Sequence, residues 1–483
     1  MKHRTVQIFT LLLALSLATS CQQQPSIDSD NIDTSSSEST PEAKANDRIS
    51  ELGTKDFGNE TFTILDDHGN INVNVPDETL EGDTLNDTIA KRNQIIQDNY
   101  NITFEYTYAT SGEDRSSLVR KSVMAGDDDY DLLFSYIPGS IGPLATEGIL
   151  ADLCQMQYLS LNEKWWSPLI YENCRINGKM YYTTGDISPI SYRGSACYYA
   201  NETLMEQYKI SKDEIYTAVE NGTWTLDMLN SLAGDLDRDL NNDNKLVADD
   251  DFFGILNENN GLTAACFMVA SGVNLSSIDD NGNLYADLTG ENVISAIEKL
   301  SEVLSNAPRR DQNALHDAFK NDRVVFLMHY ASSGYTRYRD MNSNYIMLPL
   351  PKYDEKQENY RSLMNTWMNA FVCVPLNADT ERAGFIMEVM AYMGREMVRP
   401  EAYEKALKLK GARNEKDAAM LDIIFDSLYL DFNSFMEFGG SLNPISNAIF
   451  NGGSYTSAIT SIKDSMATEM DNFSKAWVGE GNQ

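Results

Sequence analysis

The chain has 483 residues, of which 72 are acidic and 38 basic, so its net charge at neutral pH is −34. This charge argues against nucleic acid as a partner, because phosphates need lysine and arginine, and against an anionic polymer unless a local basic pocket exists. From about residue 52 onward, the sequence is long enough to bury the cores of two lobes.

The first residues form an export signal. Lys2 and Arg4 precede an apolar run, residues 6–18, that ends shortly before Cys21. A basic start, an apolar middle and small residues at the end are typical of a secretory signal peptide. The run is shorter than the roughly 20 apolar residues that span a bilayer. Cys21 at the cleavage position predicts a bacterial lipoprotein that carries lipid, palmitate included, on this cysteine; ordinary cleavage without lipid is the alternative.

A polar segment follows the signal. Residues 22–46 are mostly Gln, Ser, Asp and Thr, with too little apolar content to fold. We therefore divide the N-terminal part into a signal peptide, residues 1–20, and a lipidated flexible tether, residues 21–55. No later stretch is apolar enough to span a bilayer.

Strand-like and helical patterns then alternate. Strands are predicted over residues 62–65, 102–108 and 130–136, and helices over residues 84–99 and 118–125. Such alternation predicts a parallel sheet covered by helices. Ligands of such sheets gather outside the carboxyl ends of the strands. The polar residues at these ends are therefore candidate ligand contacts: Asp66, Asp67, Ser135 and Tyr136.

Residues 165–204 predict a passage of the chain from one lobe to the other. A strand-like run at 180–184 precedes Asp186, and Pro189 then favours extended chain at the residue before it. A second apolar run, residues 196–199, leads into a helix. Clefts between lobes commonly bind small molecules, so Asp186 is a further candidate contact.

Arg193 lies in the same passage and is notable in so acidic a chain. If it faces the cleft, its guanidinium group suits a ligand carboxylate, as in an acidic sugar. Pairing with a structural acid is the alternative. Beyond the passage, strands are predicted over residues 324–330, 345–350 and 371–375, and helices over residues 381–397, 402–409 and 418–428.

Trp367 lies just before the strand-like run at 371–375, at a predicted second passage. Its neighbours Asn365, Thr366 and Asn369 are polar, which favours a position in the cleft over one in the core. The chain is also rich in aromatic residues, with 25 Tyr, 18 Phe and 5 Trp. An aromatic face can cover the apolar face of a sugar while polar neighbours bind its hydroxyls, so these residues favour a carbohydrate ligand.

One acidic segment has the spacing of a calcium-binding loop. Side-chain oxygens occupy its first, third and fifth positions, a backbone carbonyl its seventh, and a carboxylate its twelfth. Asn244 replaces the usual glycine at the sharp turn, and Asn tolerates positive φ. A structural Ca²⁺ is predicted, with a solvated acidic turn as the alternative. The predicted ligands are Asp239, Asn241, Asp243, Lys245 and Asp250.

Signatures of catalysis are few in the sequence. Neither G-x-S-x-G, H-E-x-x-H, a phosphate loop nor a dinucleotide glycine pattern occurs. The 72 acidic residues supply many pairs by chance, so a glycosidase-like carboxylate couple stays open as an alternative. The five cysteines after Cys21 are odd in number and widely spaced, so neither a disulfide framework nor a zinc site is indicated.

Several motifs occur in a recognisable order. They are Glu147–Leu153, Cys197–Leu204, Gly222–Leu229, the calcium-type loop followed by Phe253–Ile255, Phe319–Phe326 and Tyr345–Asp354. With these motifs in this order, the chain resembles extracellular solute-binding protein family 1, the sugar-type lipoprotein receptors of ABC importers.

The resemblance implies an α/β fold of the two-lobed, type II periplasmic-binding-protein kind. Each lobe would be a mostly parallel sheet flanked by helices and closing on its ligand about a hinge. Lobe I would comprise residues 56–190 and 366–410, and lobe II residues 191–365 and 411–483. The family also implies a ligand contact just after the strand at 324–328, at His329 or Tyr330.

The expected function is capture of a carbohydrate, preferentially an oligosaccharide, in the cleft and its delivery to an ABC permease. We expect no catalysis and a monomeric protein. The lipid would hold it on the outer face of the cytoplasmic membrane of a Gram-positive bacterium. A secreted glycosidase or lyase, or a receptor for peptides or another small solute, are the alternatives.

Overall fold

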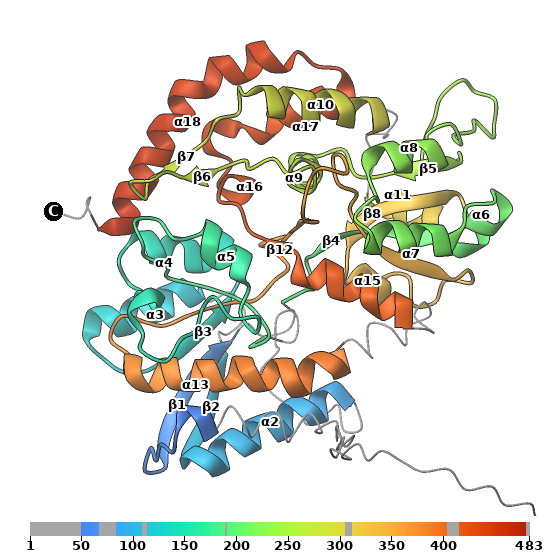
Figure 1. Cartoon of the computed structure of the whole chain (residues 1–483). Coiled ribbons are helices and arrows are strands. Elements are labelled where there is room, and N and C mark those ends of the chain that lie inside the picture. Colours follow the sequence, from blue (N-terminus) through green and yellow to red (C-terminus); the bar gives the residue numbers. More distant parts are fainter. Residues whose placement is uncertain are drawn as a thin grey trace, which may run out of the picture. The chain divides into compact units, whose positions relative to one another are not determined.

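The computed structural model describes residues 50–66, 84–108, 114–188, 191–304, 312–402 and 415–479 (Figure 1). The chain divides into two units, Met1–Ser39 and Thr40–Gln483, and every described residue lies in the second. Cys21 and Asp67 lie outside the described residues, as does most of the predicted helix at 402–409.

The first sheet has the strand order β11-β3-β1-β2. Its strands are β1 (Glu60–Asp66), β2 (Ile102–Tyr108), β3 (Leu132–Ser135) and β11 (Phe371–Cys373). β1 pairs in parallel with both β2 and β3, while β11 runs antiparallel to β3. Helices α2 (Thr84–Tyr100) and α3 (Arg115–Ala125) connect the first three strands, which confirms the parallel arrangement predicted for this part of the chain.

The second sheet has the order β5-β8-β4-β9. Its strands are β4 (Ala196–Asn201), β5 (Phe253–Leu256), β8 (Val324–Tyr330) and β9 (Tyr345–Pro349). β5 and β8 are parallel, but β4 is antiparallel to both of its neighbours, β8 and β9. The prediction of a mostly parallel sheet is therefore wrong for this sheet. The reason is that β4 runs opposite to the other three strands and takes an inner position, so its direction decides two of the pairings.

The other helices and short strands complete the described part of the chain. Among the described residues, no helix is both long and apolar enough to cross a membrane. The two-stranded ladders are β6 (Ser277–Ile278) with β7 (Leu284–Tyr285), and β10 (Ser362–Leu363) with β12 (Leu428–Tyr429). The helices up to β8 are η2 (Ile137–Ile141), α4 (Gly142–Thr146), η3 (Leu153–Gln155), α5 (Pro168–Asn173), α6 (Glu202–Gln207), α7 (Lys212–Glu220), α8 (Leu226–Ala233), α9 (Gly261–Ala270), α10 (Glu291–Leu304) and α11 (Gln312–Lys320). Those after β8 are α12 (Ser333–Thr336), α13 (Thr380–Met393), η4 (Gly394–Val398), α15 (Glu415–Asp426), α16 (Asn433–Met436), η5 (Phe438–Gly440), α17 (Leu442–Asn451) and α18 (Tyr455–Val478).

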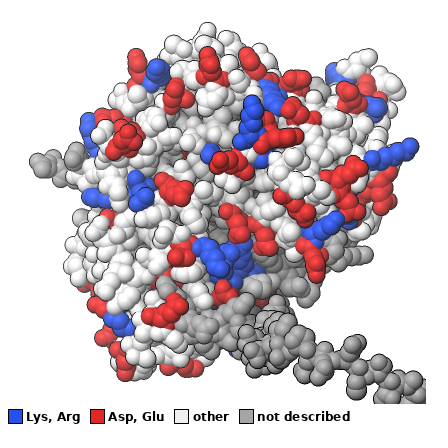
Figure 2. Space-filling model, in the orientation of Figure 1, with Lys and Arg blue, Asp and Glu red and all other residues white. Residues whose placement is uncertain are grey.

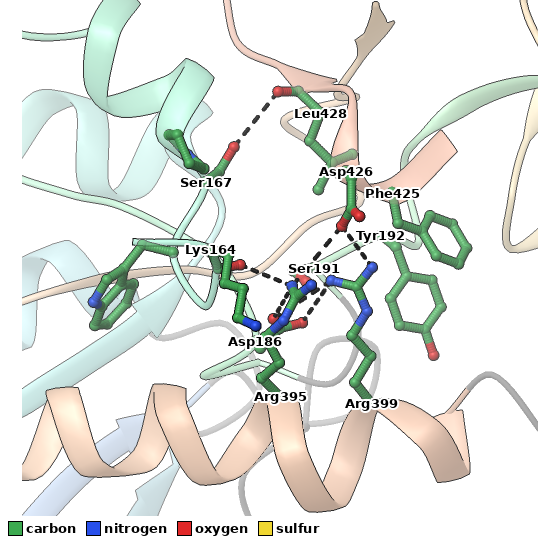
Figure 3. Close-up of a pocket in the computed structure, with 13 residues that line it drawn as sticks. Lys164, Ser167, Asp186, Ser191, Tyr192, Arg395, Arg399, Phe425, Asp426 and Leu428 are labelled. Carbon is green, nitrogen blue, oxygen red and sulfur yellow. Dashed lines mark hydrogen bonds and ion pairs between the residues drawn. The ribbon is translucent and has the colours of Figure 1, made fainter. Parts of the chain in front are cut away.

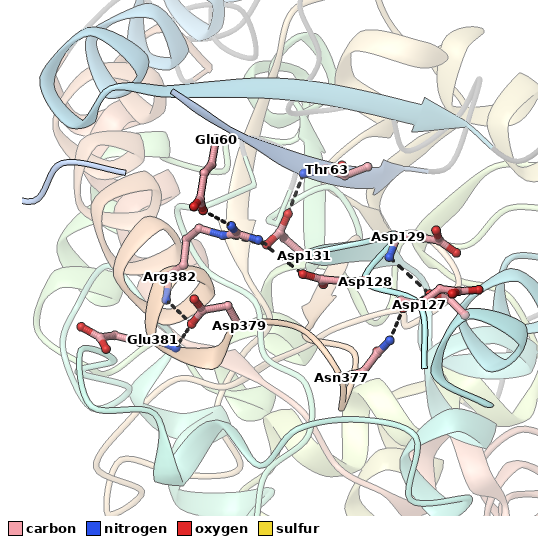
Figure 4. A network of polar contacts seen from close by, with 11 residues as sticks. Glu60, Thr63, Asp127, Asp128, Asp129, Asp131, Asn377, Asp379, Glu381 and Arg382 are labelled. Carbon is pink, nitrogen blue, oxygen red and sulfur yellow. Dashed lines mark hydrogen bonds and ion pairs between the residues drawn. The ribbon is translucent and has the colours of Figure 1, made fainter. Parts of the chain in front are cut away.

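Arg382 holds α13 against the first sheet (Figure 4). Its Nη1 lies 2.6 Å from Glu60 Oε2 at the start of β1, and its Nη2 lies 2.6 Å from Asp131 Oδ1, just before β3. The other carboxylate oxygen of Asp131 accepts the backbone N–H of Thr63 at 2.7 Å. The buried Asp131 therefore ties the helix to two neighbouring strands.

The segment that leads out of the first sheet is anchored on α13. The indole N–H groups of Trp165 and Trp166 both donate to the buried carboxylate of Glu388, at 3.0 and 2.8 Å. The strand-like run at 180–184 forms only one bridge to β11, at Thr183. Earlier in the run, the N–H of Met180 donates to the side-chain carboxylate of Asp152 at 3.1 Å.

The five cysteines beyond Cys21 are unpaired and mostly buried. Burial raises the pKa of the Cys266 thiol to about 12 and that of Cys154 to about 11. These thiols are therefore neutral at physiological pH and act as small apolar side chains. The five are Cys154, Cys174, Cys197, Cys266 and Cys373.

Candidate functional site

Polar residues meet at the carboxyl edge of the first sheet. Asp66 is the last residue of β1 and is fully buried, and Ser135 is the last residue of β3, followed by Tyr136. β1 and β3 are parallel neighbours, so their ends share one edge. β11 enters at this edge, because Phe371 lies opposite Ser135. The structure therefore brings these predicted contacts together, while Asp67 lies outside the described residues.

Trp367 lies close to this edge and is exposed over 60% of its surface, whereas the other four tryptophans are buried. Its ring centroid is 5.8 Å from that of Tyr136, with the two planes tilted by 35°. The guanidinium carbon of Arg115 lies 5.8 Å from the centroid of the same tyrosine. Trp367 is therefore not a core residue; it forms an aromatic surface together with Tyr136.

The two predicted passages of the chain lie side by side. The backbone N–H of Gly194 donates to the side-chain oxygen of Asn369 at 2.8 Å, and the N–H of Asn365 donates to the Gly194 carbonyl at 2.9 Å. The first passage is also tied to the end of β8, since the N–H of Ala331 donates to the Ser195 carbonyl at 2.9 Å. These bonds link the segment carrying Trp367 to the second sheet.

The second sheet presents its own polar edge. Asn257 and Glu258 directly follow β5, and the parallel neighbour β8 ends in His329 and Tyr330. His329 Nε2 lies 3.6 Å from Glu258 Oε1, which confirms that the two strand ends are adjacent. Asn257 and Glu258 were not predicted as contacts. The signal that could have found them is the one used for Asp66, a polar residue directly after a buried strand.

Tyr330 is buried, with 7% of its surface exposed. Burial raises the pKa of its hydroxyl well above the usual range, nearby Cys266 and Glu258 act in the same direction, and a hydrogen bond with the Asn365 side chain opposes them. Tyr330 is therefore a neutral hydroxyl at physiological pH. It lies beside the second passage because Asn365 belongs to that segment.

Several buried polar atoms around these edges have no hydrogen-bond partner among the described residues. They include Ser135 Oγ at the first sheet, Asn257 Oδ1 at the second, and Asn369 Nδ2 in the passage between them. Buried polar atoms are nearly always paired in native proteins. A hydroxyl, an amide oxygen and an amide nitrogen without partners are groups that can pair with the hydroxyls of a polyhydroxylated ligand.

A pair of buried histidines includes His329 at this second edge. The ring centroids of His316 and His329 are 4.5 Å apart. His329 Nδ1 lies 2.6 Å from Ser333 Oγ, and His316 Nδ1 lies 2.6 Å from the hydroxyl of Tyr338. Burial, with a smaller contribution from His329, lowers the pKa of His316 to about 2. His316 is therefore a neutral packing residue.

Asp186 lies in a separate pocket of about 290 Å³ (Figure 3). Its carboxylate is 3.1 Å from Arg395 Nη1 and 3.5 Å from Arg399 Nη1, and Arg399 Nη2 reaches Asp426 Oδ1 at 2.7 Å. Burial raises the pKa of Asp186, and the two arginines oppose this rise. The close approach requires Gly394, because a Cβ there would lie 1.8 Å from the Asp186 carbonyl oxygen. The structure therefore gives Asp186 two cationic partners.

Arg193 is half-buried in the first passage, and its backbone carbonyl accepts the N–H of Ser332 at 3.0 Å. Its backbone thus attaches the passage to the segment that follows β8.

Figure 2 shows basic side chains gathered in small groups between widely spread acidic ones on the face drawn. Cationic side chains near a ligand site therefore stand out against an acidic background.

A second hollow, of about 490 Å³, lies against Trp367 and is called here the Trp367 hollow. Its walls come from η2, α4, α16 and α18, and α4 and α18 pack together (Figure 1). It shares no lining residue with the Asp186 pocket. The lining consists of Ile137, Pro138, Gly139, Gly142, Pro143, Thr146, Trp367, Phe435, Met436 and Phe473.

The predicted calcium loop is organised by its own hydrogen bonds. The carboxylate of Asp239 accepts the backbone N–H of Asn242 at 2.6 Å and of Asn244 at 2.8 Å, and Asp243 accepts the N–H of Lys245 at 2.9 Å. Asn244 has a φ of 60°, as expected for the residue at the sharp turn.

The end of this loop differs from the predicted pattern. The buried Asp251 accepts the N–H groups of Leu240 and Val247 at 2.9 and 2.7 Å, whereas the predicted ligand Asp250 is exposed. Among the described residues, no group of three or more His, Cys, Asp and Glu side chains is placed to hold a metal ion. The loop is therefore a series of hydrogen-bonded turns, and its binding of calcium stays a prediction.

Comparison with known proteins shows which solved structures share this fold. No family model matches the sequence, and no curated protein matches it. The cyclic α-maltosyl-1,6-maltose binding protein of Arthrobacter globiformis aligns with a TM-score of 0.58, over 85% of this chain and 99% of its own, at 12% identity. UspC of M. tuberculosis aligns with a TM-score of 0.53, over 84% and 99%, at 12% identity.

A third structure, a cyclo/maltodextrin-binding protein in complex with maltotetraose, aligns with a TM-score of 0.53, over 85% of this chain and 97% of its own, at 14% identity. At such identities, the likeness shows the fold alone. The predicted α/β fold of the two-sheet binding-protein kind is confirmed, with sheets of mixed direction flanked by helices.

Proposed function

We propose that this chain, which has the fold of solute-binding proteins, is an extracytoplasmic substrate-binding lipoprotein of an ABC transporter. It captures a carbohydrate, preferentially an oligosaccharide, and delivers it to the permease. The observation that carries the proposal is the alignment over 85% of the chain with a protein named for binding cyclic α-maltosyl-1,6-maltose. The exposed Trp367 at the edge of the first sheet adds the aromatic surface that a sugar ring requires.

The proposed binding mode uses both sheet edges. Trp367 and Tyr136 cover one face of a sugar ring, and Asp66 and Asp67 accept hydrogen bonds from its hydroxyls. The unpaired atoms of Ser135, Asn257 and Asn369 add further hydrogen bonds, as does the neutral hydroxyl of Tyr330. A ligand held by both edges stabilises the closed arrangement of the two lobes, 56–190 with 366–410 and 191–365 with 411–483.

Two predicted contacts have conditional roles in this proposal. Asp186 binds a hydroxyl only if the ligand displaces an arginine, because Arg395 and Arg399 both contact its carboxylate. Arg193 contributes only if the sugar is acidic, since its charge suits a carboxylate. Without these conditions, each residue has a structural role only. Asp186 pairs with the two arginines, and the backbone of Arg193 attaches the first passage to the segment that follows β8.

The proposed location follows from the N-terminal sequence. Cys21 carries the lipid, residues 21–55 form the tether, and the binding unit lies outside the cytoplasmic membrane. The protein acts as a monomer and performs no chemistry on the sugar. Metabolic labelling with palmitate tests the anchor: the wild-type protein is labelled and Cys21→Ser is not, whereas a labelled Cys21→Ser variant contradicts it.

The function is tested by exposing the purified protein to a mixed glycan pool and identifying the retained species by mass spectrometry. A retained oligosaccharide that raises the melting temperature and is recovered unchanged supports a receptor. Shortened or unsaturated products would instead support a glycosidase or lyase. Retention from a peptide pool, with none from the glycan pool, would support a peptide receptor.

We also propose that the loop at 239–250 binds a structural Ca²⁺. The ligands would be the side chains of Asp239, Asn241, Asp243 and Asp250 and the carbonyl of Lys245. The spacing supports this, together with the positive φ of Asn244. The ion would hold the loop in place, and none of its proposed ligands is a residue of the proposed sugar site.

A further inference from the structure

The Trp367 hollow has an unusual lining for a sugar-binding protein. Of its ten residues, none is charged, although the chain carries a net charge of −34. The polar side-chain groups are the indole N–H of Trp367 and the hydroxyl of Thr146, and that hydroxyl donates to the Pro143 carbonyl within α4. Almost every wall of the hollow is therefore hydrocarbon or aromatic.

Such a lining disfavours a sugar ring and favours an apolar group. A sugar that entered the hollow would lose the hydrogen bonds of its hydroxyls to water without replacing them, which is unfavourable. An alkyl or aryl group would gain from leaving water. The volume of about 490 Å³ lies in the usual range of roughly 300–1,000 Å³ for small-molecule sites. The hollow is also partly open, since Met436 is 40% exposed and Trp367 60% exposed.

The hollow shares Trp367 with the proposed sugar site. Trp367 is a wall of the hollow, and its ring also lies 5.8 Å from Tyr136 at the edge of the first sheet. Ile137, which directly follows Tyr136 in the chain, lines the hollow as well. An apolar group in the hollow would therefore lie beside a sugar held at the sheet edge. The simplest occupant is a group that is covalently attached to that sugar.

We propose that the Trp367 hollow binds the apolar aglycone of an amphiphilic glycoside, an alkyl or aryl group whose sugar rests on Trp367 and Tyr136. The inference rests on the proposed function, and it narrows the substrate class from carbohydrates in general to glycosides with an apolar substituent. Each methylene that enters the hollow strengthens binding by about fourfold.

The test compares matched ligands. Glucose, maltose and cellobiose are titrated by calorimetry beside their octyl glycosides, below the micelle concentration, and octanol serves as the apolar control. We expect an octyl glycoside to bind at least tenfold more tightly than its parent sugar, and octanol alone to bind weakly. Because Trp367 is the exposed tryptophan, a shift of its fluorescence that is absent in Trp367→Phe would locate the bound group.

Variants of the hollow separate this inference from the proposed function. Met436→Glu places a charge in the hollow and should reduce the affinity ratio of glycoside to sugar to near one. Met124→Glu is the matched control, because Met124 is 78% exposed and does not line the hollow, and it should keep the full ratio. Melting temperatures confirm that both variants fold.

Three results would overturn the inference. If the parent sugars bind and their octyl glycosides bind no more tightly, or if Met436→Glu keeps the full ratio, the aglycone site is wrong while the proposed function stands. If none of the sugars or glycosides binds and the glycan pool yields no ligand, the proposed function fails and the inference fails with it.

Discussion

The backbone N–H of Gly194 donates a hydrogen bond to the side-chain oxygen of Asn369 at 2.8 Å, across 175 positions of the chain. Asn369 is fully buried. The fit is close, because a Cβ on residue 194 would lie 2.8 Å from the Asn365 carbonyl oxygen. This bond fixes the two predicted passages against each other and so determines where Trp367 lies relative to the first passage.

Replacing Asn369 with Ala should therefore weaken both folding and sugar binding. The substitution leaves the buried N–H of Gly194 unpaired, at a cost of about 1–3 kcal/mol in the free energy of unfolding. Urea denaturation measures this cost. Asn443→Ala is the control, because Asn443 is exposed on α17 and its loss should change stability by less than about 0.5 kcal/mol. Equal stabilities of the two variants would contradict the role given to this bond.

Removing the Trp367 side chain should strongly weaken sugar binding without unfolding the protein. The side chain is 60% exposed, so Trp367→Ala should change the free energy of unfolding by less than about 0.5 kcal/mol. Stacking on a sugar face would be lost, and we expect the affinity for the retained glycan to fall at least tenfold in calorimetry. Trp367→Phe should keep part of the affinity. Undiminished binding by the alanine variant would remove Trp367 from the site.

Most elements were predictable because their signals are local. The strands Ile102–Tyr108 and Val324–Tyr330 have the predicted bounds, since their apolar patterns lie within the strands themselves. The direction of β4 was not predictable in this way. It is decided by pairing with β8 and β9, more than 100 residues farther along the chain, and no pattern within Ala196–Asn201 records that pairing.

The candidate site was predictable in part for the same reason. The position of Asp66 and Ser135 at the sheet edge was predictable because a polar residue directly after an apolar strand is a local signal. The ion pairs of Asp186 with Arg395 and Arg399 join residues 209 and 213 positions apart, and neither arginine has a distinguishing local pattern. The Trp367 hollow likewise depends on the approach of α4, α16 and α18, which only the tertiary structure shows.

Calcium removal should lower the melting temperature if the loop at 239–250 binds the ion. Binding to the folded state alone stabilises it by mass action, so EGTA should reverse the stabilisation and added Ca²⁺ should restore it. Differential scanning calorimetry measures the shift. An unchanged melting temperature with EGTA would count against the site.

Two neighbouring aspartates distinguish calcium binding from loop structure. Asp250 is exposed and is the predicted ligand, so Asp250→Asn should weaken the calcium effect with little change in EGTA. Asp251 accepts two backbone N–H groups, so Asp251→Asn should destabilise the protein in EGTA as well. The opposite ranking would show that Asp251 carries the calcium effect.

Stability should fall with acidification because of His316. Its pKa is lowered to about 2 in the folded state, mainly by burial, whereas a histidine in the unfolded chain has a pKa of about 6.5. Below about pH 6.5, the unfolded state binds a proton at His316 that the folded state does not bind. The contribution of His316 to the free energy of unfolding is therefore fully present above about pH 6.5 and is lost progressively towards pH 2. The slope is up to about 1.4 kcal/mol per pH unit.

Urea denaturation at intervals between pH 7.5 and 5 measures this effect. His316→Gln cannot take up the proton, so its free energy of unfolding should fall less steeply with pH than that of the wild type. The other titrating groups are common to both proteins, so the difference between the two slopes isolates the contribution of residue 316. His316→Gln should also be less stable than the wild type at pH 7.5, since the contact with the Tyr338 hydroxyl is altered. Parallel pH profiles for the two proteins would show that His316 is not buried in its neutral form.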